Sequence, residues 1–192
     1  MPGDTQFLPA DGHLGTPAPS SEDTKSTHRA FAVRHDRCVA ELTMRLFGIR
    51  WLGARLTVSH ATFAIGTDED VLAVELATAS LRTAVPLLAK VLTGPAALRA
   101  EEFPSLYFTG YDVDILEDST VELVGQANIA GSPRDLFLEG ELRSVESDRD
   151  SVILWLRGVL PSPRRPPANS GWIARLLARR PVYVEFAAEF VR

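Results

Sequence analysis

The sequence predicts an all-β protein: an eight-stranded antiparallel β-barrel with one short helical insertion between the third and fourth strands. First, apolar and polar residues alternate with a period of two from residue 29 onward. Second, short polar turns separate the alternating segments, which is typical of an antiparallel meander. Third, these segments are about 9–11 residues long, whereas the usual strand has about 5–6. Long strands with two different faces are typical of closed barrels, because closure removes the exposed edges of a sheet.

The first three predicted strands precede the helical segment. Residues 38–46 and 71–81 carry apolar side chains at every second position, with polar side chains on the opposite face. Residues 55–65 alternate less regularly, because His60 and Thr62 interrupt the apolar face. We expect His60 to be a structural residue of the barrel wall.

One helical candidate, residues 83–103, follows the third strand. Thr83 is suited to cap the helix, Pro86 to its first turn and Gly94 to its end. Five more strands complete the predicted barrel, and the links at 116–119, 131–134 and 146–150 have turn composition. These strands span residues 105–115, 119–129, 135–145, 151–160 and 181–191.

The apolar strand faces predict the interior of the barrel. An eight-stranded barrel either fills its interior with side chains or holds one small ligand. Pockets and cores use the same apolar residue types, so the sequence leaves both alternatives open. Small inward residues (Ala40, Gly125, Ala127 and Gly140) favour a cavity, because they leave space unfilled. The candidate lumen residues are Ala40, Leu42, Met44, Leu72, Val74, Leu76, Leu106, Phe108, Leu123, Leu136, Leu138 and Leu154.

Composition and charge exclude several classes of protein. With 45% hydrophobic and 23% charged residues, the 192-residue chain is too apolar for complete disorder. Its net charge of −5 argues against a nucleic acid partner, since duplex-binding proteins carry a basic excess. The single cysteine, Cys38, excludes an internal disulfide and a Cys-rich zinc site, and we expect a buried, unreactive thiol. No apolar run reaches about 18 residues, the length that a membrane-spanning helix needs.

The sequence contains no recognisable catalytic or metal-binding pattern. No pair of its four histidines has the i,i+4 spacing of a helical metal site. Ser80 lacks the G-x-S-x-G context of a nucleophile, and Asp112 and Asp114 lie beside a turn where solvated carboxylates are expected. We therefore predict no catalytic residues, no metal site and no cofactor, in a protein that is not an enzyme.

Residues 1–28 are predicted to form a disordered N-terminal tail, and residues 29–192 the barrel domain. The tail has neither the basic region nor the apolar core of a secretory signal peptide. We therefore expect a cytoplasmic protein with a reduced thiol. The sequence leaves the oligomeric state open and is compatible with a homodimer.

Residues 161–180, between the last two predicted strands, contain five arginines and no acidic residue. Four prolines in the first seven positions exclude regular structure there. Trp172, together with Arg175, Arg179 and Arg180, is a candidate for weak contact with an anionic membrane surface. The alternative is a solvated loop that only connects two strands.

Several segments, in their order and spacing, resemble the YceI-like polyisoprenoid-binding proteins. The most specific is ATASLRT (77–83), followed by GPAALRAEEFPSLYFTGYDV (94–113). The other similar segments are CVAELTMRLFG (38–48), GARLTVSHATFAI (53–65) and GQANIAGSPRDLFLEGEL (125–142). The resemblance covers roughly residues 38–145.

The chain departs from the family pattern at several polar positions. Leu88, Ala89 and Val91 stand where the family carries an Arg-Asp pair and a histidine, and Gly110 stands where it carries a serine. The resemblance therefore implies the scaffold without these polar contacts.

The resemblance implies a lipocalin-like barrel with an isoprenoid chain in its lumen. The expected function is non-enzymatic binding or carrying of an isoprenoid-type lipid, either a polyprenyl chain or an isoprenoid quinone. An apolar-tailed lipid is thus the expected partner. The alternative is a packed-shut barrel that acts as a protein-interaction or stress-associated module.

Overall fold

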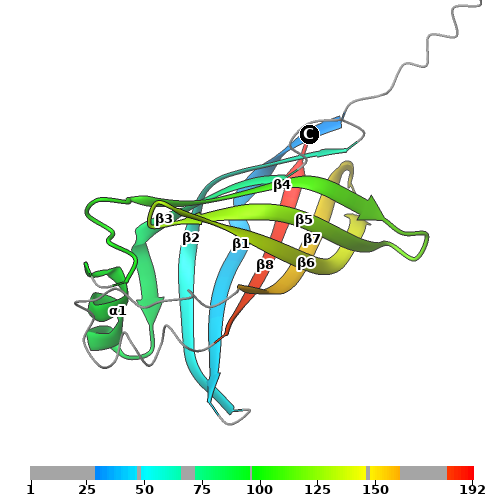
Figure 1. The fold of residues 1–192 in the computed structure, drawn as a ribbon. Coiled ribbons are helices and arrows are strands. Elements are labelled where there is room, and N and C mark those ends of the chain that lie inside the picture. Colours follow the sequence, from blue (N-terminus) through cyan, green and yellow to red (C-terminus); the bar gives the residue numbers. More distant parts are fainter. Residues whose placement is uncertain (1–28, 47–48, 66–71, 96, 146–147, 161–180) are drawn as a thin grey trace, which may run out of the picture.

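Each strand pairs with the strand that precedes it in the sequence, and the last strand returns to the first. The structure, a computed structural model, describes residues 29–46, 49–65, 72–95, 97–145, 148–160 and 181–192. In these residues eight antiparallel strands form a closed barrel with one short helix beside it (Figure 1). The fold class predicted from the alternating pattern is therefore confirmed.

Most strand boundaries lie within three residues of those predicted. The strands are β1 (Arg29–Leu46), β2 (Ile49–Ile65), β3 (Leu72–Thr83), β4 (Ser105–Ile115), β5 (Thr120–Ile129), β6 (Ser132–Val145), β7 (Asp148–Leu160) and β8 (Val182–Val191). The helix α1 (Pro86–Thr93) lies between β3 and β4. The largest differences are at the starts of the first two strands, because β1 begins at Arg29 rather than at residue 38 and β2 at Ile49 rather than at residue 55.

The first half of β1 lies in the barrel, although the predicted strand begins only at residue 38. Phe31 pairs with Phe63 of β2, and Ala32 pairs with Val191 of β8. The register with both neighbours then shifts around residues 34–37, which marks a bulge in β1. The polar sequence RHDR (34–37) occupies this bulge. It interrupts the period-two alternation from which a strand is predicted.

A second bulge explains the irregular pattern of β2. The register between β2 and β3 shifts between Val58 and His60, so that Ser59 is an extra residue. Ser59 and His60 are both exposed, and Ala61 and Phe63 are buried again beyond them. The interruption seen in the sequence is therefore a bulge that restores the inward face.

The helix occupies only the first part of the candidate segment 83–103 and is capped differently. Thr83 is the last residue of β3, and Val85 occupies the N-cap position without a side-chain cap. The Thr83 Oγ1 hydroxyl instead binds the backbone of Val85, donating to its carbonyl oxygen at 2.6 Å. Pro86 lies in the first turn and Gly94 at the C-cap, as predicted.

Candidate functional site

The inner wall of the barrel carries all twelve predicted lumen residues. Nine of them are buried, namely Ala40, Met44, Leu72, Val74, Leu106, Leu123, Leu136, Leu138 and Leu154. The remaining three, Leu42, Leu76 and Phe108, are half-buried and pack against buried core residues. That these residues bind a ligand stays a prediction.

Side chains fill the half of the barrel away from α1. The ring of Phe190 lies against Phe63 with centroids 5.7 Å apart and against Phe186 with centroids 6.4 Å apart. These three rings, hereafter the aromatic cluster, belong to one continuous buried cluster that includes residues of seven strands. Leu154 and Leu156 of β7 are fully buried within it. In this half the barrel has the packed interior of an ordinary core.

The half beside α1 is packed less completely. Its buried residues fall into two smaller clusters, separate from the large one, and α1 contributes Leu88 and Leu92 to them. Five other apolar residues lining this end of the inner wall are half-buried, so solvent reaches them. They are Leu42, Leu76, Ile129, Leu160 and Val182. This end, hereafter the mouth, lies beside α1 and the turn between β5 and β6 (Figure 1).

The inward glycines do not create the space that the sequence suggested. A Cβ atom added to Gly125 would lie 2.6 Å from the Phe108 ring and 2.5 Å from the carbonyl oxygen of Thr109. At Gly140 the added atom would lie 1.8 Å from the carbonyl oxygen of Trp155. The expectation that small residues leave a void is therefore wrong at both glycines, because neighbouring strands approach closely where no side chain separates them.

Arg134 is an inner-wall residue that the sequence analysis missed. It pairs in register with Ala127 of β5, which is buried in the core, and directly opposite residues share one face of a sheet. Its Nε atom is buried. The segment 131–134 was predicted to be a turn, but the turn lies at Ala130 and Gly131, whose φ angles are 50° and 76°. Arg134 therefore belongs to β6 and not to the link before it.

Thr78 is a buried polar residue in the same part of β3 as the half-buried Leu76. Its side chain is 0% exposed, and its Oγ1 atom has no hydrogen-bond partner among the described residues. Its backbone N–H donates to the carbonyl oxygen of Pro104 at 2.8 Å, just before β4. A buried hydroxyl without a partner destabilises a fold by about 1–3 kcal/mol.

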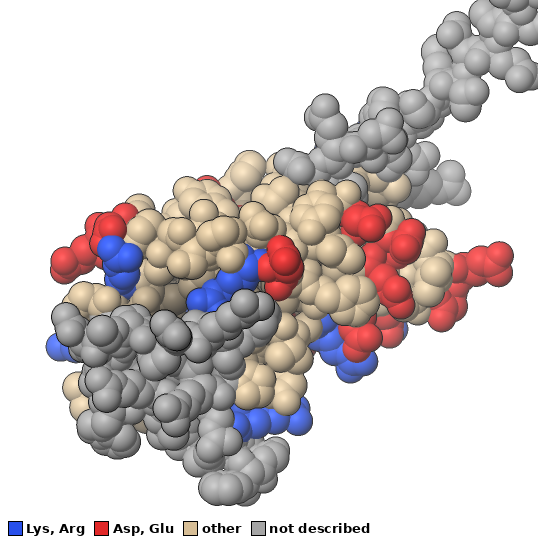
Figure 2. All heavy atoms as spheres, in the orientation of Figure 1, with Lys and Arg blue, Asp and Glu red and all other residues tan. Residues whose placement is uncertain are grey.

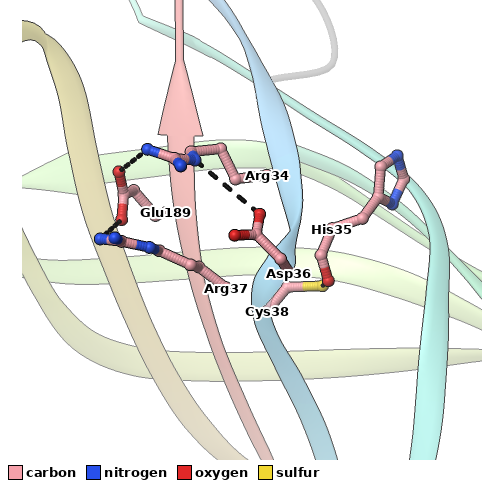
Figure 3. Close-up of polar contacts among 6 residues, drawn as sticks. All are labelled: Arg34, His35, Asp36, Arg37, Cys38 and Glu189. Atoms are coloured by element: carbon pink, nitrogen blue, oxygen red, sulfur yellow. Dashed lines mark hydrogen bonds and ion pairs between the residues drawn. The ribbon is translucent and has the colours of Figure 1, made fainter.

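The most prominent polar cluster lies on the outer wall, at the bulge of β1 (Figure 3). Glu189 of β8 is almost buried and accepts hydrogen bonds from Arg34 at 3.1 Å and from Arg37 at 2.9 Å. Asp36 lies 3.8 Å from Arg34. The cluster ties the bulge to the neighbouring strand, which is a structural role.

Cys38 lies beside this cluster, in an environment that makes its thiol a poor nucleophile. It is half-buried inside β1, whereas the sequence placed it as a buried residue at the start of a strand. Burial, together with the negative charge of Asp36, raises the pKa of the Cys38 thiol. The thiolate, which is the reactive form, is therefore disfavoured.

Other predicted features lie elsewhere or outside the described residues. His60, Asp112 and Asp114 are exposed. Within the described ranges no group of three His, Cys, Asp or Glu side chains could hold a metal ion. A search of the same ranges finds no helix long and apolar enough to span a membrane. The tail 1–28 and the membrane-contact candidates Trp172, Arg175, Arg179 and Arg180 lie outside the described residues.

The fold matches known structures, although the sequence matches no family model and no curated protein. BcnA from Burkholderia cenocepacia is 11% identical, with a TM-score of 0.57 over 82% of this chain and 98% of that chain. The YceI protein of Campylobacter jejuni is 15% identical, with a TM-score of 0.54 over 97% of this chain and 91% of that chain. A polyisoprenoid binding domain from Saccharophagus degradans, implicated in plant cell wall breakdown, is 11% identical, with a TM-score of 0.53 over 85% of this chain and 98% of that chain. The chain therefore has the fold of the YceI-like proteins.

Proposed function

We propose that this protein, whose fold is that of the YceI-like proteins, binds an isoprenoid-type lipid without transforming it, and holds the apolar tail in the mouth. The observation that carries the proposal is the half-buried apolar lining of the mouth. Inward-facing leucine, isoleucine and valine side chains there remain accessible to solvent, and the buried residues around them form small clusters separate from the large one. A tail that covers them removes apolar surface of both partners from water.

The energy of such binding comes mainly from the tail. Each methylene removed from water contributes roughly 0.8 kcal/mol, so a chain of a few isoprene units supplies most of a micromolar affinity. Few polar contacts are then required. This fits the helix α1 beside the mouth, on which Leu88, Ala89 and Val91 stand where the similar family carries polar residues.

The similar structures support the same class of ligand. One of them is a polyisoprenoid binding domain, and it shares the barrel over most of both chains. The outer-wall cluster and Cys38 offer no activated nucleophile, since the pKa of the thiol is raised. A binding role therefore accounts for the inner wall better than catalysis does.

The aromatic cluster sets how deep a tail reaches. Phe186, Phe63 and Phe190 occupy the lumen beyond the mouth. A tail entering beside α1 ends against them, so the protein accepts chains of limited length in this conformation.

A second candidate is a protein-interaction module. Apolar side chains are exposed on the outer wall of three neighbouring strands: Phe137 of β6 at 50%, Val159 of β7 at 46% and Tyr183 of β8 at 36%. Val159 and Tyr183 are paired in register. Such a row is compatible with a partner protein, and the packed half of the barrel gives it a rigid support.

Uptake of a prenyl alcohol distinguishes the two candidates. Wild-type protein is mixed with farnesol, and the bound mass is measured by native mass spectrometry together with the affinity. We expect one farnesol per chain, strong loss of binding in Leu160→Glu at the mouth, and unchanged binding in Val159→Glu, the adjacent outer-wall residue. Absence of uptake by folded wild-type protein would favour the interaction module.

A further inference from the structure

On one side of the mouth the barrel wall continues with α1 in place of a paired strand. β3 pairs with β4 only from Leu72 to Ala77, although β3 continues to Thr83. One further backbone hydrogen bond, from Thr78, reaches the segment before β4. Residues 79–83 have no partner in β4, and α1 lies beside this end of β3 (Figure 1).

The apolar side of α1 packs on the surface that lines the mouth. The helix contributes Ala89 and Leu92, and the segment after it contributes Leu98, to one of the small buried clusters. Three lining residues of the mouth pack against the same cluster: Leu42, Leu76 and Ile129. A tail that covers this lining must therefore contact α1 or take its place.

Apolar contacts alone attach α1 to the strands. Among the described residues, no hydrogen bond or ion pair joins residues 86–93 to a strand. Leu88, Ala89 and Leu92 are only half-buried and α1 has no buried side chain, whereas every strand contains buried residues. A helix of eight residues is not stable by itself, so its position depends on these partial contacts. Separating α1 from the barrel therefore requires less free energy than separating any strand.

The attachments of α1 allow it to turn as a unit. Backbone hydrogen bonds join the helix to the segment 97–103, and the N–H group of Leu98, for example, donates to the last turn of α1 at 2.9 Å. This unit follows Thr83 of β3 directly. At its other end the ring of Phe103 packs against the turn between β5 and β6, since a Cβ atom on Gly131 would lie 2.8 Å from it. Rotation about these two ends moves α1 outward without breaking a strand pair.

The opposite end of the barrel is a poor entrance for an apolar tail. The aromatic cluster fills the lumen in that half. Exposed acidic residues gather there on the hairpin of β4 and β5, as the right-hand side of Figure 2 shows. They are Asp112, Asp114, Glu117, Asp118 and Glu122. Charged, hydrated side chains are unfavourable surroundings for an apolar chain, so a tail enters beside α1.

We propose that α1 and residues 97–103, hereafter the lid, open to admit or release the lipid and close over the tail as in this structure. The inference rests on the proposed function and adds the control of exchange at the same site. The tail and the lining set the affinity, whereas the contacts of the lid with the barrel set the rates of uptake and release.

The first test loosens the lid by one side chain. Uptake and release of N-phenyl-1-naphthylamine, an uncharged dye that fluoresces in apolar surroundings, are measured by stopped flow, with farnesol as the competitor. Leu92→Ala is compared with Leu87→Ala, the same truncation at a position of α1 that is 71% exposed. Leu92→Ala should accelerate both uptake and release at least about tenfold, since less apolar surface holds the lid closed. Their ratio should change much less, and Leu87→Ala should behave as wild type.

The second test locks the lid. Leu88 packs against the buried pair of Met44 and Leu52, so Leu88→Cys and Leu52→Cys are combined in a Cys38→Ser background and oxidised. The disulfide should slow uptake and release by at least about a hundredfold, and a reductant should restore both rates. Leu88→Cys alone, in the same background and after the same treatment, should exchange the dye at the rate of the reduced pair.

Wild-type rates in folded Leu92→Ala, or rapid exchange in the oxidised pair, overturn the inference and leave the proposed function intact. Failure of wild-type protein to bind either the dye or farnesol contradicts the proposed function, and the inference with it. Melting curves establish that each variant is folded. If Leu92→Ala does not fold, Leu92→Val takes its place, and if the disulfide does not form, the comparison of the Leu92 and Leu87 variants decides.

Discussion

The ring of Phe190 lies 5.7 Å from the ring of Phe63, centroid to centroid, and both side chains are fully inaccessible to solvent. The two residues come from opposite ends of the barrel sequence, on β8 and β2. Their contact lies in the packed half of the barrel, and Phe186, which packs against Phe190, lies between it and Val182 of the mouth along β8. The first prediction follows from this position of Phe186.

Shortening Phe186, the member of the aromatic cluster that pairs in register with Ala40, should deepen the lumen. Phe186→Ala should cost about 3–5 kcal/mol of unfolding free energy, and Phe186→Leu less. Both variants should bind geranylgeraniol better relative to farnesol than wild type does. Competition binding with the two alcohols measures this ratio.

The matched control is Phe137→Ala, because Phe137 is 50% exposed on the outer wall. It should leave the ratio unchanged. A ratio that stays at the wild-type value in a folded Phe186 variant would show that the aromatic cluster does not limit the tail.

Replacing Thr78 with valine should stabilise the lipid-free protein. The Oγ1 atom of Thr78 is buried and has no hydrogen-bond partner among the described residues, so removing it relieves an uncompensated loss of hydration. We expect a gain of about 1–2 kcal/mol in unfolding free energy, measured by urea denaturation. Thr62→Val, at an exposed position of β2, should change it by less than about 0.5 kcal/mol. Destabilisation by Thr78→Val would mean that the hydroxyl is satisfied in solution.

Neutralising Glu189 should destabilise the barrel, because its carboxylate accepts hydrogen bonds from Arg34 and Arg37. The side chain of Glu189 is only 8% exposed, so water replaces these contacts poorly. We expect Glu189→Gln to lower the unfolding free energy by about 1–3 kcal/mol in urea denaturation. Glu122→Gln, at an exposed position of β5, should leave the midpoint nearly unchanged, and an equal shift in both variants would argue against a specific role for Glu189.

The reactivity of Cys38 should depend on pH in a defined direction. Burial and the Asp36 carboxylate raise the pKa of the thiol, so at about pH 8 less thiolate is present than in an unperturbed cysteine. The rate of reaction with an aromatic disulfide should therefore be low at that pH and increase further into the alkaline range. Asp36→Asn should lower the pKa and raise the rate, whereas Asp135→Asn, at an exposed position of β6, should not. Rapid reaction of the wild type near neutral pH would contradict the raised pKa.

The sequence predicted those strands whose local alternation and flanking turn residues agree with the strand pairing of the folded barrel. β4 spans residues 105–115 as predicted, because apolar and polar residues alternate in its first half and a polar turn follows it, although its register with β5 shifts between Gly110 and Asp112. The start of β1 was missed because the bulge at residues 34–37 interrupts the alternation that a strand search uses. Its strand character depends on pairing with β2 and β8, which local sequence does not report.

The site was harder to predict than the fold. Alternation assigns the inward face, but it cannot tell whether opposite walls touch, since Phe63 and Phe190 meet only after the barrel closes. Arg134 was missed because Ser132 and Pro133 before it have turn composition. The turn between β5 and β6 lies instead at Ala130, which has a positive φ angle. Alanine is not a residue type that predicts such a conformation.

The pairing of β1 with β8 imposes an order on folding. Every other strand pair joins neighbours in the sequence and can form while the chain is being synthesised. The pairing of β1 with β8, hereafter the seam, cannot form until the last strand has been synthesised. Until then β1 and β7 present unpaired edges that can recruit another chain. The ion pairs from Arg34 and Arg37 to Glu189 cross the same seam, so they form only after the nascent barrel has closed. They then stabilise the contact between its first and last strands.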